Sequence, residues 1–339
     1  MKTFFHPDQR LHEPKSFLFR GRMRAPQEVA ARIRPLLDAV ARLGFELCEP
    51  PDRGMAPLQA VHSDAYLEFL RTAHAQWTAQ GADWGEEVIS NVYVREPNAL
   101  RGILALAGAY QADGACPIGE HTWRAAYASA QSAIAAAHEV LDGGASAYAL
   151  CRPPGHHARP AAAGGFCYLN NAAIAAQLLR TRHERVAILD TDMHHGQGVQ
   201  EIFWERPDVL YVSVHGDTTN FYPAVTGFDE ERGAGKGAGF NRNFPMPHGS
   251  DEATFFAHVD RAIGAVREFR PTALVFALGF DVYERDPQAR VAVSNAGFRT
   301  LGARVRSLEL PTVIVQEGGY FIDALERNCT EFFEGFLGR

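Results

Sequence analysis

Short runs of apolar residues alternate along the chain with longer segments in which apolar residues recur at helical spacing. Five runs are almost continuously apolar, which is typical of strands covered on both faces and therefore of a parallel sheet. These candidate strands are Ala147–Cys151, Arg185–Asp190, Val209–Val214, Ala273–Leu278 and Thr312–Gln316. The candidate helices are Ala25–Leu43, Asp64–Gln80, Thr122–Leu141, Asn170–Arg180, Asp251–Phe269 and Ala296–Leu308. This order predicts an α/β protein whose sheet lies between helices.

Composition supports one packed domain. The 339 residues are 46% hydrophobic and 22% charged, values that exclude a disordered or collagen-like chain. Two stretches, at 91–121 and 217–249, are rich in glycine and proline and too long for simple connections, so we expect functional loops there. No linker divides the sequence. We therefore expect a single domain over residues 1–339, with an insert at about 91–121.

Charge and cysteine content exclude several classes of protein. The formal net charge is −7 and no dense block of lysine and arginine occurs, so the sequence predicts no nucleic-acid partner and favours a cationic substrate. The five cysteines are widely spaced and form no C-x-x-C pair, which argues against a disulfide framework and a thiolate zinc site. No apolar run has the length of a membrane span or a secretory signal. We expect a cytoplasmic protein without a membrane partner.

Residues capable of chemistry follow the candidate strands, where ligand sites of parallel α/β sheets lie. Asp190, Asp192 and His194 alternate after the second strand and therefore share one side of an extended chain. Two carboxylates and an imidazole in that setting are costly unless a cation compensates them, which predicts a divalent metal. Asp281, after the fourth strand, is a candidate third ligand that leaves an open position for water. Taken alone, Asp281 fits a helix or turn cap better than a metal ligand.

Two further strand ends carry candidate catalytic groups. His156 and His157 follow the first strand in a turn stiffened by proline, and imidazoles suit general acid–base work near neutral pH. Tyr320 follows the last strand after two glycines and could donate a hydrogen bond to developing negative charge. Incidental surface histidines and a packed surface tyrosine are the alternatives. Asp286 is expected only to shape a turn before a proline.

The same segments resemble a known family. They are P-P-G-H-H at 153–157, G-G-F-C-Y-L-N-N at 164–171, D-T-D-M-H-H-G-Q-G at 190–198, L-G-F-D at 278–281 and E-G-G-Y at 317–320. Together they resemble the zinc-dependent histone deacetylase superfamily, which implies the arginase/deacetylase fold with a central eight-stranded parallel sheet between helices. The opening F-F-H-P-D-Q-R-L-H and the insert V-R-E-P-N…C-P-I-G-E-H-T-W at 94–123 are most similar to the bacterial acetylpolyamine amidohydrolases.

That resemblance implies an activity and an assembly. The activity is zinc-dependent hydrolysis of the acetamide of N-acetylated polyamines or related acetylated alkyl amines, releasing acetate and free amine. The insert implies a homodimer with a narrowed channel entrance. A small cationic acetylated amine is therefore the expected substrate, and one Zn²⁺ per chain the expected cofactor, although carboxylate and imidazole ligands also accept Fe²⁺.

The resemblance also implies roles for individual residues. Zn²⁺ would be bound by Asp192, His194 and Asp281, and catalysis would use His156, His157 and Tyr320. A structural K⁺ would be held by Asp190, Ser213 and the carbonyl groups of Asp192, His194 and Val214. A second monovalent cation would be held by the carbonyl groups of Phe203, Arg206, Val209 and Phe240. The substrate channel would be lined by Gly165, Phe166, Phe221 or Tyr222, and Gln288.

The partners of the two histidines differ from the family pattern. Asp190 would support His156, whereas Gln197 stands beside His157 where many relatives carry Asp or Asn. Since Gln197 has no charge, it should leave His157 less basic than an aspartate would. His157 would take a proton from water and pass it to the leaving amine, and Tyr320 would stabilise the oxyanion.

Substrate choice leaves alternatives open. Asp113 and Glu120 are candidates to meet a distal ammonium group, with two solvated carboxylates as the alternative, and Gln288 leaves the channel rim without a charge. A protein acetyl-lysine deacylase is a rival function, which a restricted entrance disfavours. A two-metal ureohydrolase is disfavoured because Gly196 and Tyr283 stand where extra carboxylates would be needed. A non-catalytic acetyl-amine binder would require a broken site, and none of the catalytic positions is broken.

Overall fold

A central parallel sheet organises the molecule. The computed structural model describes residues 1–94 and 99–339. Over these residues eight parallel strands pair in the order β4-β1-β5-β12-β10-β6-β7-β8. Their bounds are β1 Lys2–Phe4, β4 Glu46–Cys48, β5 Ser146–Ala149, β6 Val186–Asp190, β7 Val209–Gly216, β8 Asn241–Met246, β10 Ala273–Leu278 and β12 Thr312–Gln316. The predicted fold is confirmed.

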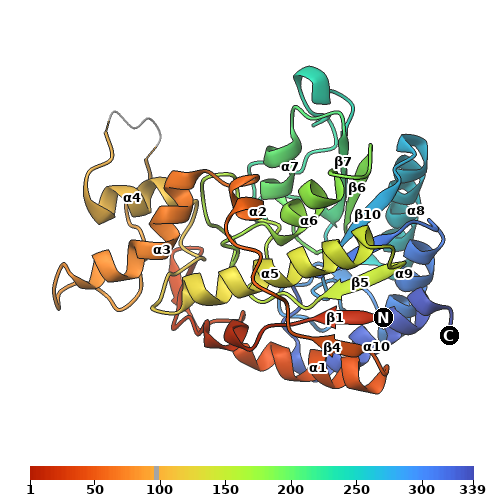
Figure 1. Cartoon of the computed structure of the whole chain (residues 1–339), viewed down its shortest axis with the longest axis horizontal. Coiled ribbons are helices and arrows are strands. Elements are labelled where there is room, and N and C mark those ends of the chain that lie inside the picture. The colour runs from red at the N-terminus through yellow and green to blue at the C-terminus, as the bar shows by residue number, and fades with distance from the viewer. Residues whose placement is uncertain (95–98) are drawn as a thin grey trace.

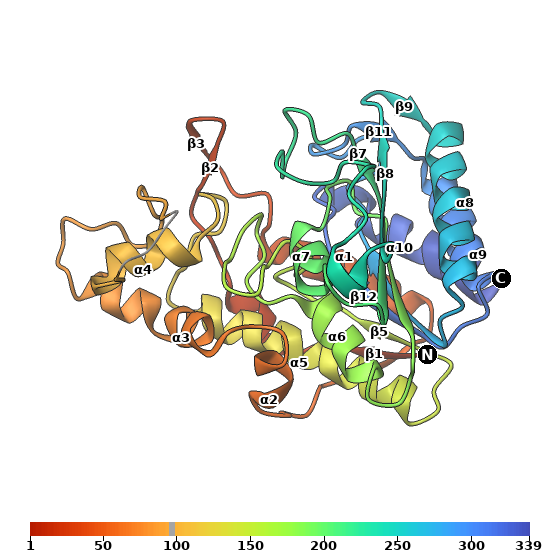
Figure 2. The same cartoon turned by 90° about the horizontal axis from the view of Figure 1, so that it is seen from above.

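Helices cover both faces of this sheet, so the inner strands β6, β7, β10 and β12 are buried along their whole length. One face packs against α5 (Thr122–Leu141), α6 (Asn171–Leu179) and α7 (Gln197–Phe203). The other face packs against α1 (Ile33–Arg42), α8 (Glu252–Phe269), α9 (Asn295–Arg306) and α10 (Ile322–Leu337). Figure 2 shows α6 and α7 on one side of the sheet and α8 on the other. Alternate strand residues contribute to the two cores: Val186 and Ile188 to one, Ala187 and Leu189 to the other.

Most of the predicted helices and strands agree with the observed ones. The strands 273–278 and 312–316 and the helix 122–141 have the predicted bounds, and the other predicted strands shift by one or two residues at an end. The helix predicted over Ala25–Leu43 is wrong in its first part, because α1 begins only at Ile33, after a 3-10 turn at Ala30–Arg32. Proline at position 26 removes a backbone donor there, and the Glu28 and Arg32 side chains turn into the core instead.

Several elements had no prediction. They include the short strand β1, the short edge strand β4, the polar edge strand β8, and the helices α2 (Ala56–Gln59), α4 (Gly102–Tyr110), α7 and α10. A hairpin of β2 (Phe17–Phe19) and β3 (Arg22–Arg24) and a small sheet of β9 (Ser250–Asp251) and β11 (Val291–Ala292) were also not foreseen. A strand of three residues is too short to show the alternation of apolar and polar residues. The helix α4 begins at Gly102 and has no capping side chain that would mark its start.

The insert projects from one end of the sheet. Figure 1 shows α4 beside α3 (Asp64–Thr78), away from the helices that flank the sheet. The β2–β3 hairpin reaches the insert, since the Leu18 amide donates to the Gly114 carbonyl at 2.9 Å. Part of the insert motif at 94–123 falls at 95–98, outside the described residues. Over the described residues, no helix is both long and apolar enough to cross a membrane.

Candidate active site

The catalytic candidates meet because four neighbouring strands end at the same edge of the sheet. The loops after β5, β12, β10 and β6 carry the histidine pair, Tyr320, Asp281 and Asp192, and these strands are adjacent in that order. Parallel strands present their carboxyl ends to one side, so segments separated by more than 100 residues in sequence converge there. The convergence expected from the strand ends is therefore present.

The predicted metal ligands form one compact group. Asp192, His194 and Asp281 are buried, and each offers a ligand atom within 4.8 Å of the others. The Nδ1 of His194 lies 3.0 Å from an Asp281 oxygen and 3.3 Å from an Asp192 oxygen. The Gly318 and Met193 amides donate to Asp192 and Asp281 at 2.8 and 2.9 Å, which fixes both carboxylates.

The electrostatics of this group favour a bound cation. Burial and the negative charge of Asp192 raise the pKa of Asp281 to about 7, because two adjacent buried carboxylates repel each other. Although burial opposes it, hydrogen bonds to Asp192 and Asp281 raise the pKa of His194 to about 9. Two carboxylates and one imidazole with an open side match the ligand chemistry of a catalytic divalent metal such as zinc. The residues present therefore fit that ion.

The two adjacent imidazoles have opposite environments. The Nδ1 of His156 lies 3.0 Å from Asp190, and although burial opposes it, Asp192 and Asp190 raise the pKa of His156 to about 10. The Nδ1 of His157 lies 2.6 Å from the Gln197 oxygen, and burial together with the charge of His156 lowers the pKa of His157 well below its usual value. The ring centroids are 3.9 Å apart. One ring therefore favours the charged form and the other the neutral form that can accept a proton.

Tyr320 is held by contacts that the sequence did not reveal. The guanidinium of Arg32 lies 4.9 Å from the centre of the Tyr320 ring, and it donates to the carbonyls of Gly319 and Glu317 at 2.6 and 2.7 Å. Glu28 pairs with Arg32 at 2.8 Å, so the buried guanidinium is neutralised. Burial raises the pKa of Tyr320 well above its usual value, so the phenol stays protonated and can donate.

Asp286 does more than shape a turn, so that expectation was incomplete. One oxygen accepts from the Gln288 amide at 2.9 Å, as in a turn, but the other accepts from the Tyr320 and Phe321 amides at 2.6 and 2.9 Å. The carboxylate thereby ties the loop after β10 to the loop that carries Tyr320. Sequence alone could not show a pairing between residues 34 positions apart.

Replacing Asp286 by asparagine should lower the free energy of unfolding by about 1–3 kcal/mol, because an amide cannot accept all three hydrogen bonds. Urea unfolding of the variant measures the change. The matched control is Asp229→Asn on an exposed position of another loop, which should stay within about 0.5 kcal/mol. Equal stability of the two variants would show that the Asp286 contacts contribute nothing.

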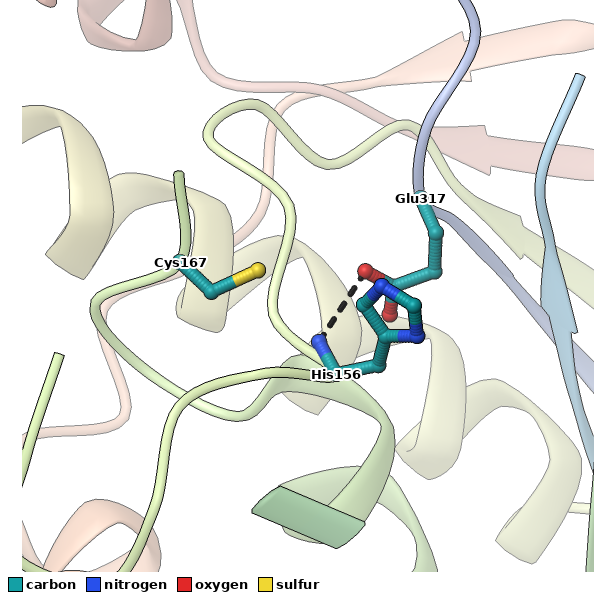
Figure 3. A group of neighbouring side chains, drawn as sticks. All are labelled: His156, Cys167 and Glu317. Carbon is teal, nitrogen blue, oxygen red and sulfur yellow. Dashed lines mark hydrogen bonds between the residues drawn. The ribbon is translucent and has the colours of Figure 1, made fainter. Parts of the chain in front are cut away.

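Glu317 connects the last strand to the histidine loop. Its Oε2 accepts from the Gly155 and His156 amides at 2.7 and 3.1 Å, and Figure 3 shows the bond to the His156 backbone. His156, Cys167 and Glu317 also offer ligand atoms close to one another. Burial raises the pKa of the Cys167 thiol well above its usual value, and the Glu317 carboxylate is engaged by amides, so this group is a structural link.

A narrow cavity leads to the metal ligands. It measures about 50 Å³ and is lined by Phe17, Phe19, Ala115, His157, Gly165, Phe166, His194, Tyr222, Gln288 and Tyr320. Gly165 is required because a Cβ there would lie 2.5 Å from the His157 ring. Of the two predicted aromatic candidates, Tyr222 lines this cavity, whereas Phe221 stacks on His194 with ring centroids 4.9 Å apart. Phe17 and Phe19 were missed, because they come from a hairpin more than 100 residues before the strand-end motifs that carry the catalytic groups.

The two acidic candidates for substrate binding lie in different places. Asp113 lines a wider hollow of about 600 Å³ that shares Phe19, Tyr222 and Gln288 with the narrow cavity. Glu120 lines a separate hollow of about 370 Å³, so the structure does not bring it to the channel.

The residues expected to hold K⁺ lie beneath the metal group. Asp190 and Ser213 are paired across β6 and β7. Asp190 accepts from Tyr211 at 2.9 Å and from the Asp192 amide at 3.1 Å, and the Ser213 hydroxyl lies 2.8 Å from His215. The position of Asp190 thus connects the sheet to both the histidine pair and the metal group.

Comparison with known proteins identifies the family. The family model described as histone deacetylase domain matches residues 26–336. An acetylpolyamine amidohydrolase of Burkholderia pseudomallei is 65% identical over 99% of this chain and 98% of its own, and acetylpolyamine amidohydrolase 1 of Pseudomonas aeruginosa is 41% identical over 100% and 99%. A crystal structure of acetylpolyamine aminohydrolase from Burkholderia pseudomallei superposes with a TM-score of 0.98 at 65% identity, covering 99% and 98% of the two chains. The chain belongs to the histone deacetylase family and is an amidohydrolase of the deacetylase type.

Proposed function

We propose that the protein hydrolyses the acetamide of N-acetylated polyamines or related acetylated alkyl amines. The observation that carries the proposal is the narrow aromatic cavity, which is lined by His194 of the metal-ligand group, by His157 of the histidine pair and by Tyr320. Such a cavity admits an acyl group on a slender alkyl chain. The relatives named acetylpolyamine amidohydrolases, which match over nearly the whole length, support the choice of amine.

Asp192, His194 and Asp281 would hold one Zn²⁺, which supplies Lewis acidity for the acetamide carbonyl and a water molecule. The neutral His157 accepts the proton of the attacking water and returns it to the leaving amine. The charged His156, paired with Asp190, supports the developing negative charge. Tyr320 donates its hydroxyl to the oxyanion and holds that position through Arg32 and Asp286.

Comparing substrates tests the proposed amine. We expect kcat/KM for N-acetylputrescine and acetylspermidine to exceed that for an acetyl-lysine peptide by at least about tenfold, because a flanking peptide must fit the aromatic rim of Phe17 and Phe19. The same preparation and metal content serve for all three substrates. Faster turnover of the peptide would instead favour the protein deacylase function.

We also propose that K⁺ binds at Asp190 and Ser213, as the resemblance implies. Binding to the folded state alone stabilises it by mass action. The midpoint of thermal unfolding should therefore be higher in potassium chloride than in tetramethylammonium chloride at equal ionic strength. Equal midpoints in the two salts would count against the potassium site.

We propose a homodimer that uses the insert. Val92, Tyr93 and Leu104 of the insert are exposed, as are Leu18 and Met23 of the adjacent hairpin. Exposed large apolar side chains in neighbouring elements support a protein interface. Light scattering after size exclusion should give twice the mass of the chain, and Leu104→Glu should shift it toward one chain. Val225→Glu, at an exposed apolar position outside the insert, is the control.

We propose a cytoplasmic location. Over the described residues the five cysteines are free, and four of them are buried, which suits a reducing compartment. Immunoblotting of cell fractions from the native host tests the location, and recovery outside the cytoplasmic fraction would contradict it.

A further inference from the structure

A chain of hydrogen bonds runs from the proposed base to the insert. The Nδ1 of His157 lies 2.6 Å from the Gln197 oxygen. The Gln197 amide nitrogen donates to the Tyr222 hydroxyl at 3.0 Å, and that hydroxyl donates to Asp113 at 2.7 Å. Asp113 belongs to the insert, 44 residues before His157, so this chain links the insert to the catalytic histidine.

The far end of the chain determines its direction. Burial raises the pKa of Asp113, but both of its oxygens accept hydrogen bonds from backbone amides, from Ala115 at 2.8 Å and from Gly165 at 3.2 Å, and these donors favour the carboxylate as the acceptor at this end. The Tyr222 hydroxyl must therefore donate to Asp113 and accept from Gln197. Gln197 then presents its nitrogen to Tyr222.

The direction of the chain also assigns the proton on His157. With its nitrogen turned to Tyr222, Gln197 turns its oxygen to His157, and only an Nδ1–H can donate to that oxygen. The Nε2 of His157 is then left with a free lone pair. A carboxylate beside His157 would enforce this by itself, but an amide such as Gln197 can rotate and offer either oxygen or nitrogen.

We propose that Asp113 is a positioning residue that holds His157 in the Nδ1–H tautomer through Tyr222 and Gln197. This inference rests on the proposed function, in which His157 Nε2 accepts a proton. The carboxylate of the insert thereby takes over the orienting role that Gln197 cannot perform alone. Asp113 is thus used as the end of this chain as well as a wall of the wider hollow.

The substitution Asp113→Asn reverses the direction of the hydrogen bonds between residue 113 and His157. The new amide nitrogen can donate to the Tyr222 hydroxyl, which then donates to the Gln197 oxygen and turns the Gln197 nitrogen toward His157. His157 Nδ1 becomes an acceptor, so its proton moves to Nε2. We expect kcat for acetylputrescine to fall about 10- to 100-fold with KM changed less than about threefold, because the ground-state contacts remain.

A double-mutant cycle separates positioning from loop structure. In Gln197→Glu, a carboxylate contacts His157 directly, so the tautomer no longer depends on Asp113. Asp113→Asn should therefore lower kcat by less than about threefold in the Gln197→Glu background. An equal loss in both backgrounds would mean that Asp113 serves only to hold the Gly165 loop, which overturns the proposal.

Nitrogen NMR tests the tautomer without turnover. In metal-free protein with ¹⁵N-histidine, the protonated and free ring nitrogens of a neutral imidazole give distinct signals, and His157→Ala identifies those of His157. We expect Nδ1–H in the native protein and Nε2–H in Asp113→Asn. Tyr222→Phe, which breaks the chain but keeps both amide bonds to Asp113, should also lose the pure Nδ1–H form and serves if Asp113→Asn fails to fold.

The outcomes of the two proposals are distinguishable. An unchanged His157 spectrum in Asp113→Asn or Tyr222→Phe overturns the positioning role, whatever the activity. Native protein that binds zinc but leaves acetylputrescine intact overturns the proposed function, while the NMR spectra still test the hydrogen-bond chain.

Discussion

Replacing Tyr320 by phenylalanine is expected to lower kcat for acetylputrescine by about 10²–10³-fold, with KM changed less than about threefold. The hydroxyl contributes mainly to the transition state, because it donates to an oxyanion that the ground state lacks. The Tyr320 side chain is held in place before substrate binds, because Asp286 accepts from the Tyr320 amide at 2.6 Å and Arg32 lies against the Tyr320 ring. Steady-state kinetics at a fixed zinc content measure the loss.

Tyr127→Phe is the control for this variant. Tyr127 bears a hydroxyl that donates to the Asp52 carboxylate at 2.5 Å, but it lies on α5 and does not line the cavity. Activity of Tyr127→Phe should match that of the native protein. Activity of Tyr320→Phe within about threefold of native would show that another group stabilises the oxyanion.

Replacing Asp281 by asparagine is expected to abolish tight zinc binding and, with it, turnover. The change removes one of two negative charges from the ligand group and leaves Asp192 and His194. It also relieves the repulsion that raises the pKa of Asp281 to about 7. The metal-free variant should therefore unfold at a higher temperature than the metal-free native protein.

Thermal unfolding with and without zinc measures both effects. At zinc concentrations of about 1,000 times the dissociation constant, the native protein should gain about 4 kcal/mol, whereas Asp281→Asn should gain almost nothing. Glu284→Gln, at an exposed carboxylate three residues further along the same loop, should behave as the native protein does. One zinc per chain in purified Asp281→Asn would contradict this assignment of the ligands.

Much of the fold and the core of the site could be predicted from local pattern. Continuous apolar runs such as 273–278 have to be buried on both faces, which requires a parallel sheet covered by helices. Because the carboxyl ends of such strands share one edge, the positions of Asp192, His194 and Asp281 in the sequence already implied that they meet. Burial and the direction of parallel strands are properties that a short segment carries by itself.

Other features were decided only by packing between distant segments. The three-residue strands β1 and β4 gain their place by pairing, not by a period of their own. The channel wall takes Phe17 from the N-terminal hairpin, and Tyr320 is held by Arg32 across 288 positions of sequence.

The two acidic residues of the insert also show the difference between what local sequence predicts and what packing decides. Asp113 and Glu120 are seven residues apart and looked equivalent in sequence, yet Asp113 lines the wider hollow that adjoins the channel and Glu120 lines a separate hollow. Local periodicity reports whether a segment is buried, but not which distant side chain it meets, because that depends on the summed packing of the whole chain. The sequence thus determined the sheet and the metal-ligand group, and the tertiary structure decided what surrounds and orients them.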